Sequence, residues 1–314
     1  MSVRVNVDTF RAAETARMFD SILAMSSGVN RWFHYRAPTP IDHQPVIRMN
    51  RDTLYSAAIV DLAGGATLTV PDTAGRYLSV MVVNAEHFIH RIYRDPGTHV
   101  LTQADHGTRH VLLAARTFVD PAHAEDVAAV NALQDRLALD AASAGAFEHP
   151  AYDPASLDET RGALITLARG VGETTRTFGS PDEVEPTRHL IGTATGWGGL
   201  PSSEAVYLLR TEPRHAGRYT LTLRDVPADA FWSVSIYNRD GFFEANPFDA
   251  YSRNSVTSER EPDGSVVLNL APDGEGLRNH LYVMDGWNHA IRLYRPRPAA
   301  TDGSWTAPEP VPAD

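Results

Sequence analysis

The chain has 314 residues and a mass of 34.4 kDa, which suits one large domain or two smaller ones because a single core rarely grows past about 250–300 residues. Its 43% of hydrophobic and 21% of charged residues are typical of a folded globular protein, and a net charge of −11 without a basic cluster argues against a nucleic-acid partner. Cysteine and lysine are both absent, which excludes disulfides, thiolate metal sites, cysteine nucleophiles, Schiff-base chemistry, P-loops and protein-kinase sites.

The first predicted element is a helix from Asp8 to Met25, because Asp8 can cap it and apolar residues recur at helical spacing. Charged residues interrupt Met1–Met25, so it lacks the apolar core of a signal peptide, and the chain has no run of about 18 apolar residues. We therefore expect a cytoplasmic protein without a membrane partner. Gly28 is expected to end the helix, and a loop from Arg31 to Gln44 follows.

Short strand-like runs come next, separated by turns rich in glycine, proline and aspartate. Their regular spacing is typical of an all-β sandwich or jelly roll. We predict an N-terminal helix plus a jelly-roll-like domain over residues 1–118. The runs are Leu54–Leu62, Ala66–Val70, Tyr77–Val83, Phe88–Tyr93 and His110–Thr117.

Residues 119–200 are predicted to form a helical connection. Asp120-Pro121 and Asp153-Pro154 each place a capping residue and a first-turn proline ahead of apolar residues at helical spacing. A glycine-rich loop from Gly192 to Pro201 is expected to lead into the next part of the chain.

The remaining part, residues 201–314, is predicted to be a C-terminal β-sandwich domain. The expected fold class is mainly β with α segments: two β-sandwich or jelly-roll-like domains joined by a helical connection. Ligand sites favour the junction of two domains, so we expect a small-molecule substrate in the cleft there, and two sandwich edges suggest a homodimer. The strand-like runs are Ala205–Arg210, Arg218–Leu223, Phe231–Tyr237, Ser265–Leu270, Leu281–Met284 and Ala290–Tyr294.

The densest polar cluster surrounds Arg51, at the start of a predicted strand where side chains can point into a cleft. Arg51 could hold a substrate carboxylate with both arms of its guanidinium, while Asp52 fixes its plane. Arg48, Asn50 and Tyr55 are candidate partners of the substrate. The alternative is a structural Arg–Asp pair beside a tight turn.

A second candidate is the pair Glu86 and His87, in which the carboxylate would orient a histidine general base. His90 follows three residues later, and His87 with His90 could hold a metal ion only if the strand were bent, because the two side chains otherwise face opposite sides. The alternative is that both histidines are structural.

Two further segments supply candidate substrate-binding residues. His189 and Trp197 flank a segment with several glycines, which could approach a ligand closely or could simply plug a seam. The C-terminal part offers a polar and aromatic edge that could line a pocket or cap loops, and its members are Tyr237, Glu244, Asn246, Tyr251 and Asn254.

Two strings of residues resemble known families. The run from Val46 to Ser56, which contains NRDTLY, resembles domain of unknown function 1254, and the run from Asp229 to Asn238, with the pattern FWS-x-x-x-YN, resembles domain of unknown function 1214. The two resembled domains together are expected to cover most of the chain. The resemblance implies an N-terminal jelly-roll-like domain, a helical connection and a C-terminal β-sandwich, and it carries over no catalytic residues.

Three functions remain open on these observations. The first is a hydrolase or lyase acting on a carboxylate- or ester-bearing molecule, in which Arg51 holds the anion and His87 with Glu86 moves a proton. The sequence requires no cofactor, although a divalent metal would serve the hydrolytic variant. The second is a ligand-binding or structural module without catalysis. The third is oxidation at a non-haem metal, for which His87, His90 and His189 are the candidates.

Overall fold

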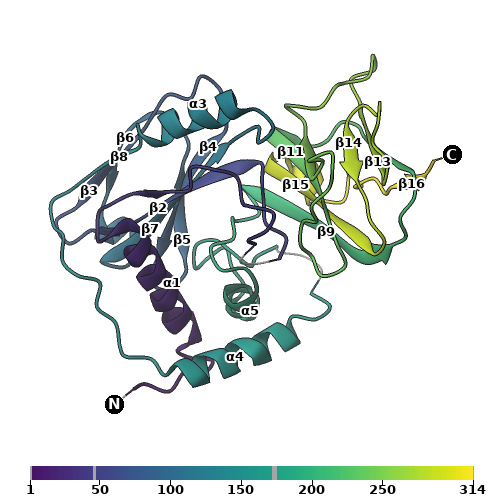
Figure 1. Cartoon of the computed structure of the whole chain (residues 1–314). Helices are drawn as coiled ribbons and strands as arrows, with labels where there is room; N and C mark the ends of the chain where they lie inside the picture. Colours follow the sequence, from purple (N-terminus) through teal and green to yellow (C-terminus); the bar gives the residue numbers. More distant parts are fainter. Residues whose placement is uncertain (1, 45–46, 172–174, 314) are drawn as a thin grey trace. The chain divides into compact units, whose positions relative to one another are not determined.

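The computed structural model describes residues 2–44, 47–171 and 175–313 (Figure 1). Val46, the first residue of the run that contains NRDTLY, lies outside these residues. The chain forms two compact units: the first holds Met1–Arg36, Leu54–Phe118 and Ala128–Ser202, and the second holds Ala37–Thr53, Val119–Val127 and Ser203–Asp314. The segment 119–200, expected to be a separate connection, therefore lies mostly in the first unit.

The first unit contains two sheets whose side chains share one core. The core includes Val60, Leu68, Val80 and Leu113, which lie on strands of both sheets. One sheet has the order β1 (Phe33–His34), β2 (Thr53–Asp61), β7 (His110–Phe118), β4 (Leu78–Asn84), β5 (Ile89–Tyr93), and the other β6 (Gly97–Leu101), β3 (Ala66–Val70), β8 (Ala138–Ala141).

Helices complete the first unit, and three of them pack on one another around Phe10, Leu157 and Leu164. These are α1 (Phe10–Ser26), α4 (Pro154–Leu167) and α5 (Pro186–Gly196). The Asp153 side chain caps α4 by accepting from the Ser156 N–H, as predicted. The short α2 (Gln103–His106) follows β6, and α3 (Ala124–Gln134) crosses the boundary of the two units.

The glycine-rich loop expected from Gly192 is wrong as far as Gly196, because these residues form the last part of α5. Close packing explains the glycine. A Cβ atom on Gly192 would lie 2.1 Å from Thr177 Cγ2, so only glycine lets the helix approach this segment. Glycine disfavours a helix by about 1 kcal/mol relative to alanine, and the packing of α5 against α1 and α4 outweighs that preference.

The second unit is also built from two sheets around one core. The order of the first sheet is β12 (Ser252–Asn254), β11 (Ala228–Tyr237), β15 (Trp287–Pro296), β9 (Ala205–Arg214), and that of the second is β14 (His280–Tyr282), β13 (Val266–Ala271), β10 (Tyr219–Leu223), β16 (Val311–Pro312). β13 and β14 are parallel, so the second sheet is mixed. The core between the sheets includes Val234, Ile291 and Leu268.

A histidine lies in this apolar surrounding. His289 on β15 is fully buried, its ring centroid is 5.7 Å from that of Trp287, and neither ring nitrogen has a hydrogen-bond partner among the described residues. Burial lowers the pKa of His289 to about 4. The imidazole is therefore neutral in the folded protein at pH 7.

The fold class is confirmed at the level of a mainly β protein with helices, since the described residues form four open sheets and five α-helices besides a short 3-10 helix at Pro298–Ala300. The jelly-roll topology stays a prediction. No helix in the described part of the chain is long and apolar enough to cross a membrane.

Candidate anion-binding site

The residues singled out in the sequence divide between the two units. The first unit holds Tyr55, Glu86, His87, His90, His189 and Trp197. The second holds Arg48, Asn50, Arg51, Asp52, Tyr237, Glu244, Asn246, Tyr251 and Asn254. Several members of the second group lie together, and they are described first.

Arg292, in the middle of β15, forms the central hydrogen bonds among the site residues of the second unit. Its guanidinium is buried and donates to Ser235 Oγ (2.9 Å), to Tyr237 Oη (2.7 Å) and to the Arg48 carbonyl oxygen (2.8 Å). Tyr237 Oη in turn donates to the Met49 carbonyl at 2.8 Å. A buried guanidinium is tolerated only where its donors find acceptors, so these bonds fix the backbone of residues 48–49 against the sheet.

Asn50 and Asp52 continue this network. Asn50 accepts from the Asp52 backbone N–H at 2.7 Å and donates to Tyr294 Oη at 2.7 Å. Asp52 is fully buried, and its Oδ1 accepts from Ser252 Oγ and Asn254 Nδ2, both at 3.2 Å. Burial raises the pKa of Asp52 above its usual range, while the charge of Arg292 opposes that rise.

Two arginines of the same segment are only partly buried and lack acidic partners. Arg48 has a left-handed backbone (φ 54°) and donates to Asn288 Oδ1 at 3.4 Å. Arg51 lies over the Tyr251 ring, with Cζ 5.2 Å from the centroid, and donates to the Thr39 carbonyl. Neither forms an ion pair with a residue that the structure describes.

The electrostatics of the two arginines favour an anion. Burial lowers the pKa of both guanidinium groups, and the charge of Arg292 lowers the pKa of Arg48 further. The charges of Asp249 and Asp52 raise the pKa of Arg51 and so oppose the effect of burial. Both buried Nε atoms lack an acceptor within the described part of the chain. An anion bound here would supply that acceptor and offset the cost of burying the charges.

Of the other predicted residues of the second unit, Asn246 and Glu244 lie outside this site. Asn246 closes a turn by accepting from the backbone N–H groups of Phe248 and Ala250. Glu244 is exposed to solvent. Tyr251 and Asn254, in contrast, belong to the site, because the first lies under Arg51 and the second holds Asp52.

His87, in the first unit, has both ring nitrogens engaged. Thr193 Oγ1 donates to the His189 carbonyl and therefore accepts from His87 Nδ1 at 2.8 Å, while Nε2 accepts from the Gly198 backbone N–H at 2.9 Å. Burial, and the charges of His189 and Arg11, lower the pKa of His87 well below its usual range. In this arrangement His87 is a neutral histidine that has no free nitrogen for a proton or a metal.

The neighbours of His87 pack around it and do not orient it as a base. The rings of His189 and Trp197 each stack on the ring of His87, with ring centroids 5.2 Å apart in both pairs. His189 donates from Nδ1 to the Thr177 carbonyl, and Trp197 donates to Thr15 Oγ1. Glu86 is exposed.

His90 and Tyr55 have separate surroundings. His90 is exposed, and its ring lies near Asn84 and His106. Tyr55 lies under Arg116, whose Cζ is 5.5 Å from the ring centroid. The described residues contain no group of three or more histidine, aspartate or glutamate side chains that could hold a metal ion.

Arg292 is the central residue that the sequence analysis missed. The sequence predicts the run from Ala290 to Tyr294 only as a strand, and the single arginine inside it is the signal that could have found the network. The strand period places Arg292 and Tyr294 on one face and Ile291 and Leu293 on the other, so a charged residue at a buried position of a strand indicates a polar network behind it.

Comparisons with known proteins agree with the resemblance found in the sequence. Residues 29–102 match the family model described as "Protein of unknown function (DUF1254)", and residues 210–298 match "Protein of unknown function (DUF1214)". No curated protein matches the chain.

Two solved structures are similar to the chain. A crystal structure from Vibrio parahaemolyticus has 16% sequence identity and a TM-score of 0.76, and covers 98% of each chain. An uncharacterized protein from Burkholderia cenocepacia has 13% identity and a TM-score of 0.53, with 97% of this chain and 87% of that one covered. At these identities the likeness concerns the fold alone.

Proposed function

We propose that this chain, a member of the family that pairs the DUF1254 and DUF1214 domains, binds a small carboxylate-bearing molecule through Arg48 and Arg51. The proposal rests on the chemistry of the chain's own side chains. The observation that carries the proposal is that both guanidinium groups are partly buried without an ion-pair partner in the described part of the chain, on a segment that Arg292 and Tyr237 hold in place.

The chemistry of arginine supports a carboxylate. A guanidinium presents its donors as a planar fork that matches the two oxygens of a carboxylate, and such charge-assisted hydrogen bonds are about twice as strong as neutral ones. The fixed backbone supports the same conclusion, because groups that are already ordered lose less entropy when the ligand binds.

Hydrolysis or elimination of the bound molecule is the second candidate, and Asp52 is the observation that favours it. A carboxyl group whose pKa is raised by burial can hold a proton closer to neutral pH than a solvated one. Asp52 is fully buried, so its role would be to hold a proton in the network of Ser252 and Asn254 behind the arginines.

Titration with succinate tests the binding proposal. In the full chain labelled with nitrogen-15, succinate is expected to shift the Nε–H signals of Arg48 and Arg51, which have no acceptor in the described structure. Arg48→Gln and Arg51→Gln are each expected to weaken binding about tenfold or more, because each removes a charge-assisted hydrogen bond. Calorimetric titrations of the wild type and the two variants with succinate, under the same conditions, measure this loss of affinity.

Arg218→Gln is the matched control, since Arg218 is an exposed arginine of the same unit that already pairs with Asp273 at 2.7 Å. An equal loss of affinity in this control would contradict the proposal and indicate a general effect of charge. Replacing succinate by monoethyl succinate separates binding from turnover: release of ethanol by the wild type but not by Asp52→Asn supports hydrolysis, and binding without release supports a binding protein.

A further inference from the structure

Arg48 and Arg51 are close in sequence, but their guanidinium groups contact different parts of one sheet. The Arg48 side chain donates to Asn288 Oδ1 on β15 at 3.4 Å, and a Cβ atom on Gly241 would lie 3.3 Å from its Nη1. The Arg51 guanidinium lies over the Tyr251 ring, just ahead of β12. The two charged groups are therefore anchored at separate places.

The strand order of this sheet sets the separation of the two anchors. β11 lies between β12 and β15. On one side Tyr237 of β11 pairs with Asn288, and on the other the Ile236 N–H donates to the Tyr251 carbonyl. Asn288 and Tyr251 therefore lie at nearly the same level and two strand spacings apart, which is about 10 Å. The two oxygens of one carboxylate span far less, so one carboxylate does not reach both arginines while they keep these contacts.

The surface between the anchors is apolar. Tyr237, Phe243 and Tyr251 form a row of buried rings, with neighbouring centroids 4.8 Å and 5.8 Å apart. Met49 and Ile41 pack on this row and are only partly buried, so they supply its accessible apolar atoms. Because a charge placed against apolar atoms loses its hydration, the charged groups of a ligand belong at the two ends of the row.

We infer that the ligand of this site is a dicarboxylate with an apolar spacer, which places one carboxylate at Arg48 and the other at Arg51. The inference rests on the proposed anion site and specifies its ligand class. Each arginine has a buried Nε atom without an acceptor among the described residues. The acid near Arg51 is Asp249, and its Oδ1 accepts from Tyr251 Oη at 3.3 Å. Two unpaired cations at separate anchors are matched best by two anions on one chain.

Adipate and hexanoate test the inference in the full chain, because these acids have equally long carbon chains and differ by one carboxylate. In calorimetric titrations the wild type is expected to bind adipate about tenfold more tightly, since a second charge-assisted pair forms. Arg48→Gln and Arg51→Gln are each expected to remove this difference. Hexanoate is expected to keep nearly its wild-type affinity in either variant, because the remaining arginine still binds it.

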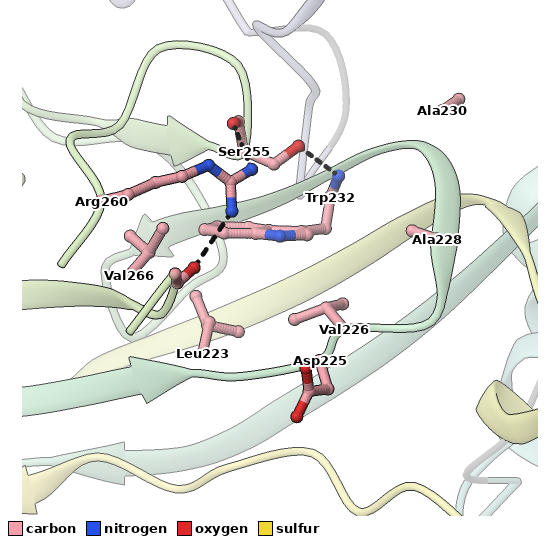
Figure 2. Close-up of a pocket in the computed structure, with 10 residues that line it drawn as sticks. Leu223, Asp225, Val226, Ala228, Ala230, Trp232, Ser255, Arg260 and Val266 are labelled. Atoms are coloured by element: carbon pink, nitrogen blue, oxygen red, sulfur yellow. Dashed lines mark hydrogen bonds between the residues drawn. The ribbon is translucent and has the colours of Figure 1, made fainter. Parts of the chain in front are cut away.

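Arg260 provides the matched control, because it is another arginine of the second unit that forms no ion pair within the described part of the chain. It lines a separate cavity of about 260 Å³ beside Trp232 (Figure 2) and donates to the carbonyl oxygens of Gly264 (3.1 Å) and Ser255 (3.4 Å). Arg260→Gln is expected to keep the wild-type affinity for adipate. An equal loss in this variant would overturn the inference, because the diacid would then recognise unpaired arginines in general.

Two further outcomes separate this inference from the proposed function. Equal affinities of the wild type for adipate and hexanoate would overturn the dicarboxylate and leave the anion site standing. A loss of hexanoate affinity of about tenfold in both arginine variants would then show that the two guanidinium groups share one carboxylate. Absence of binding of adipate, hexanoate and succinate alike would refute the anion site itself, and the inference with it.

Discussion

Arg292 shows how a single buried charge determines the geometry of the proposed anion site. Three acceptors on two separate segments converge on one guanidinium, and one of them is the carbonyl of Arg48, a residue of the site itself. Lysine is a poorer replacement, because its three donors radiate from one nitrogen, whereas Nη1 of Arg292 reaches Ser235 and Nη2 reaches Tyr237 and Arg48. Arg292 is a positioning residue for Arg48.

We therefore predict that Arg292→Met lowers the free energy of unfolding by about 3–5 kcal/mol, because it leaves Asp52 and the freed acceptors buried without their cation. Urea denaturation of the full chain measures the loss. The double variant Arg292→Met/Asp52→Asn is expected to lose less than the sum of the single losses. Strict additivity of the two would contradict the coupling of these charges.

At this scale the sequence predicted part of the site. Arg48, Asn50, Arg51 and Asp52 are close in sequence, so their grouping could be predicted from spacing alone. Their partner on β15 could not, because Arg48 and Arg292 are far apart in the chain. Only the pairing of β11 with β15 brings Arg292 beside Ser235 and Tyr237. His87 was misleading for the opposite reason: a histidine beside a glutamate indicates a base only if its nitrogens are free.

The elements themselves were largely predictable where apolar periodicity is strong. The run Ala66–Val70 was predicted with the bounds that β3 has, and its buried residues alternate with partly exposed ones. β6 and β8 were missed, because they are short and mostly exposed, and their pairing with β3 defines them. Such strands depend on a partner that local propensity does not reveal.

The glycines of α4 and α5 provide a matched test of packing against propensity. Gly192→Ala is expected to destabilise the protein, because its Cβ would lie 2.1 Å from Thr177 Cγ2, and a clash of this kind costs about 1–3 kcal/mol. Gly162→Ala in α4 has no atom within 4 Å of the new Cβ and is expected to stabilise by about 0.5–1 kcal/mol. Thermal melts compare the two, and equal signs would contradict the packing argument.

Both units carry neutral histidines in their interiors, so the whole molecule shares one response to acid. Burial lowers the pKa of His106 in the first unit and of His289 in the second, each to about 4. The unfolded chain takes up these protons near pH 6.5, before the folded one does. The contribution of these two histidines to the free energy of unfolding is therefore complete above about pH 6.5 and is lost as the pH falls from there toward 4.

We predict that the melting temperature falls over this interval and that His289→Phe makes the fall shallower, because it removes one group that must stay neutral in the fold. His215→Gln is the control, since that side chain is almost fully exposed. Thermal melts of the wild type and the two variants between pH 7 and pH 4 compare how steeply the melting temperature falls. Parallel curves for wild type and His289→Phe would show that this histidine does not contribute.

The position of His289 beside Trp287 also has an optical consequence. An imidazolium quenches the emission of a neighbouring indole more strongly than a neutral imidazole does, and the two rings are 5.7 Å apart in the interior of the second unit. The emission of Trp287 should therefore dim when His289 takes up its proton. The fluorescence of Trp287 thus reports the protonation of His289 in the interior of the second unit.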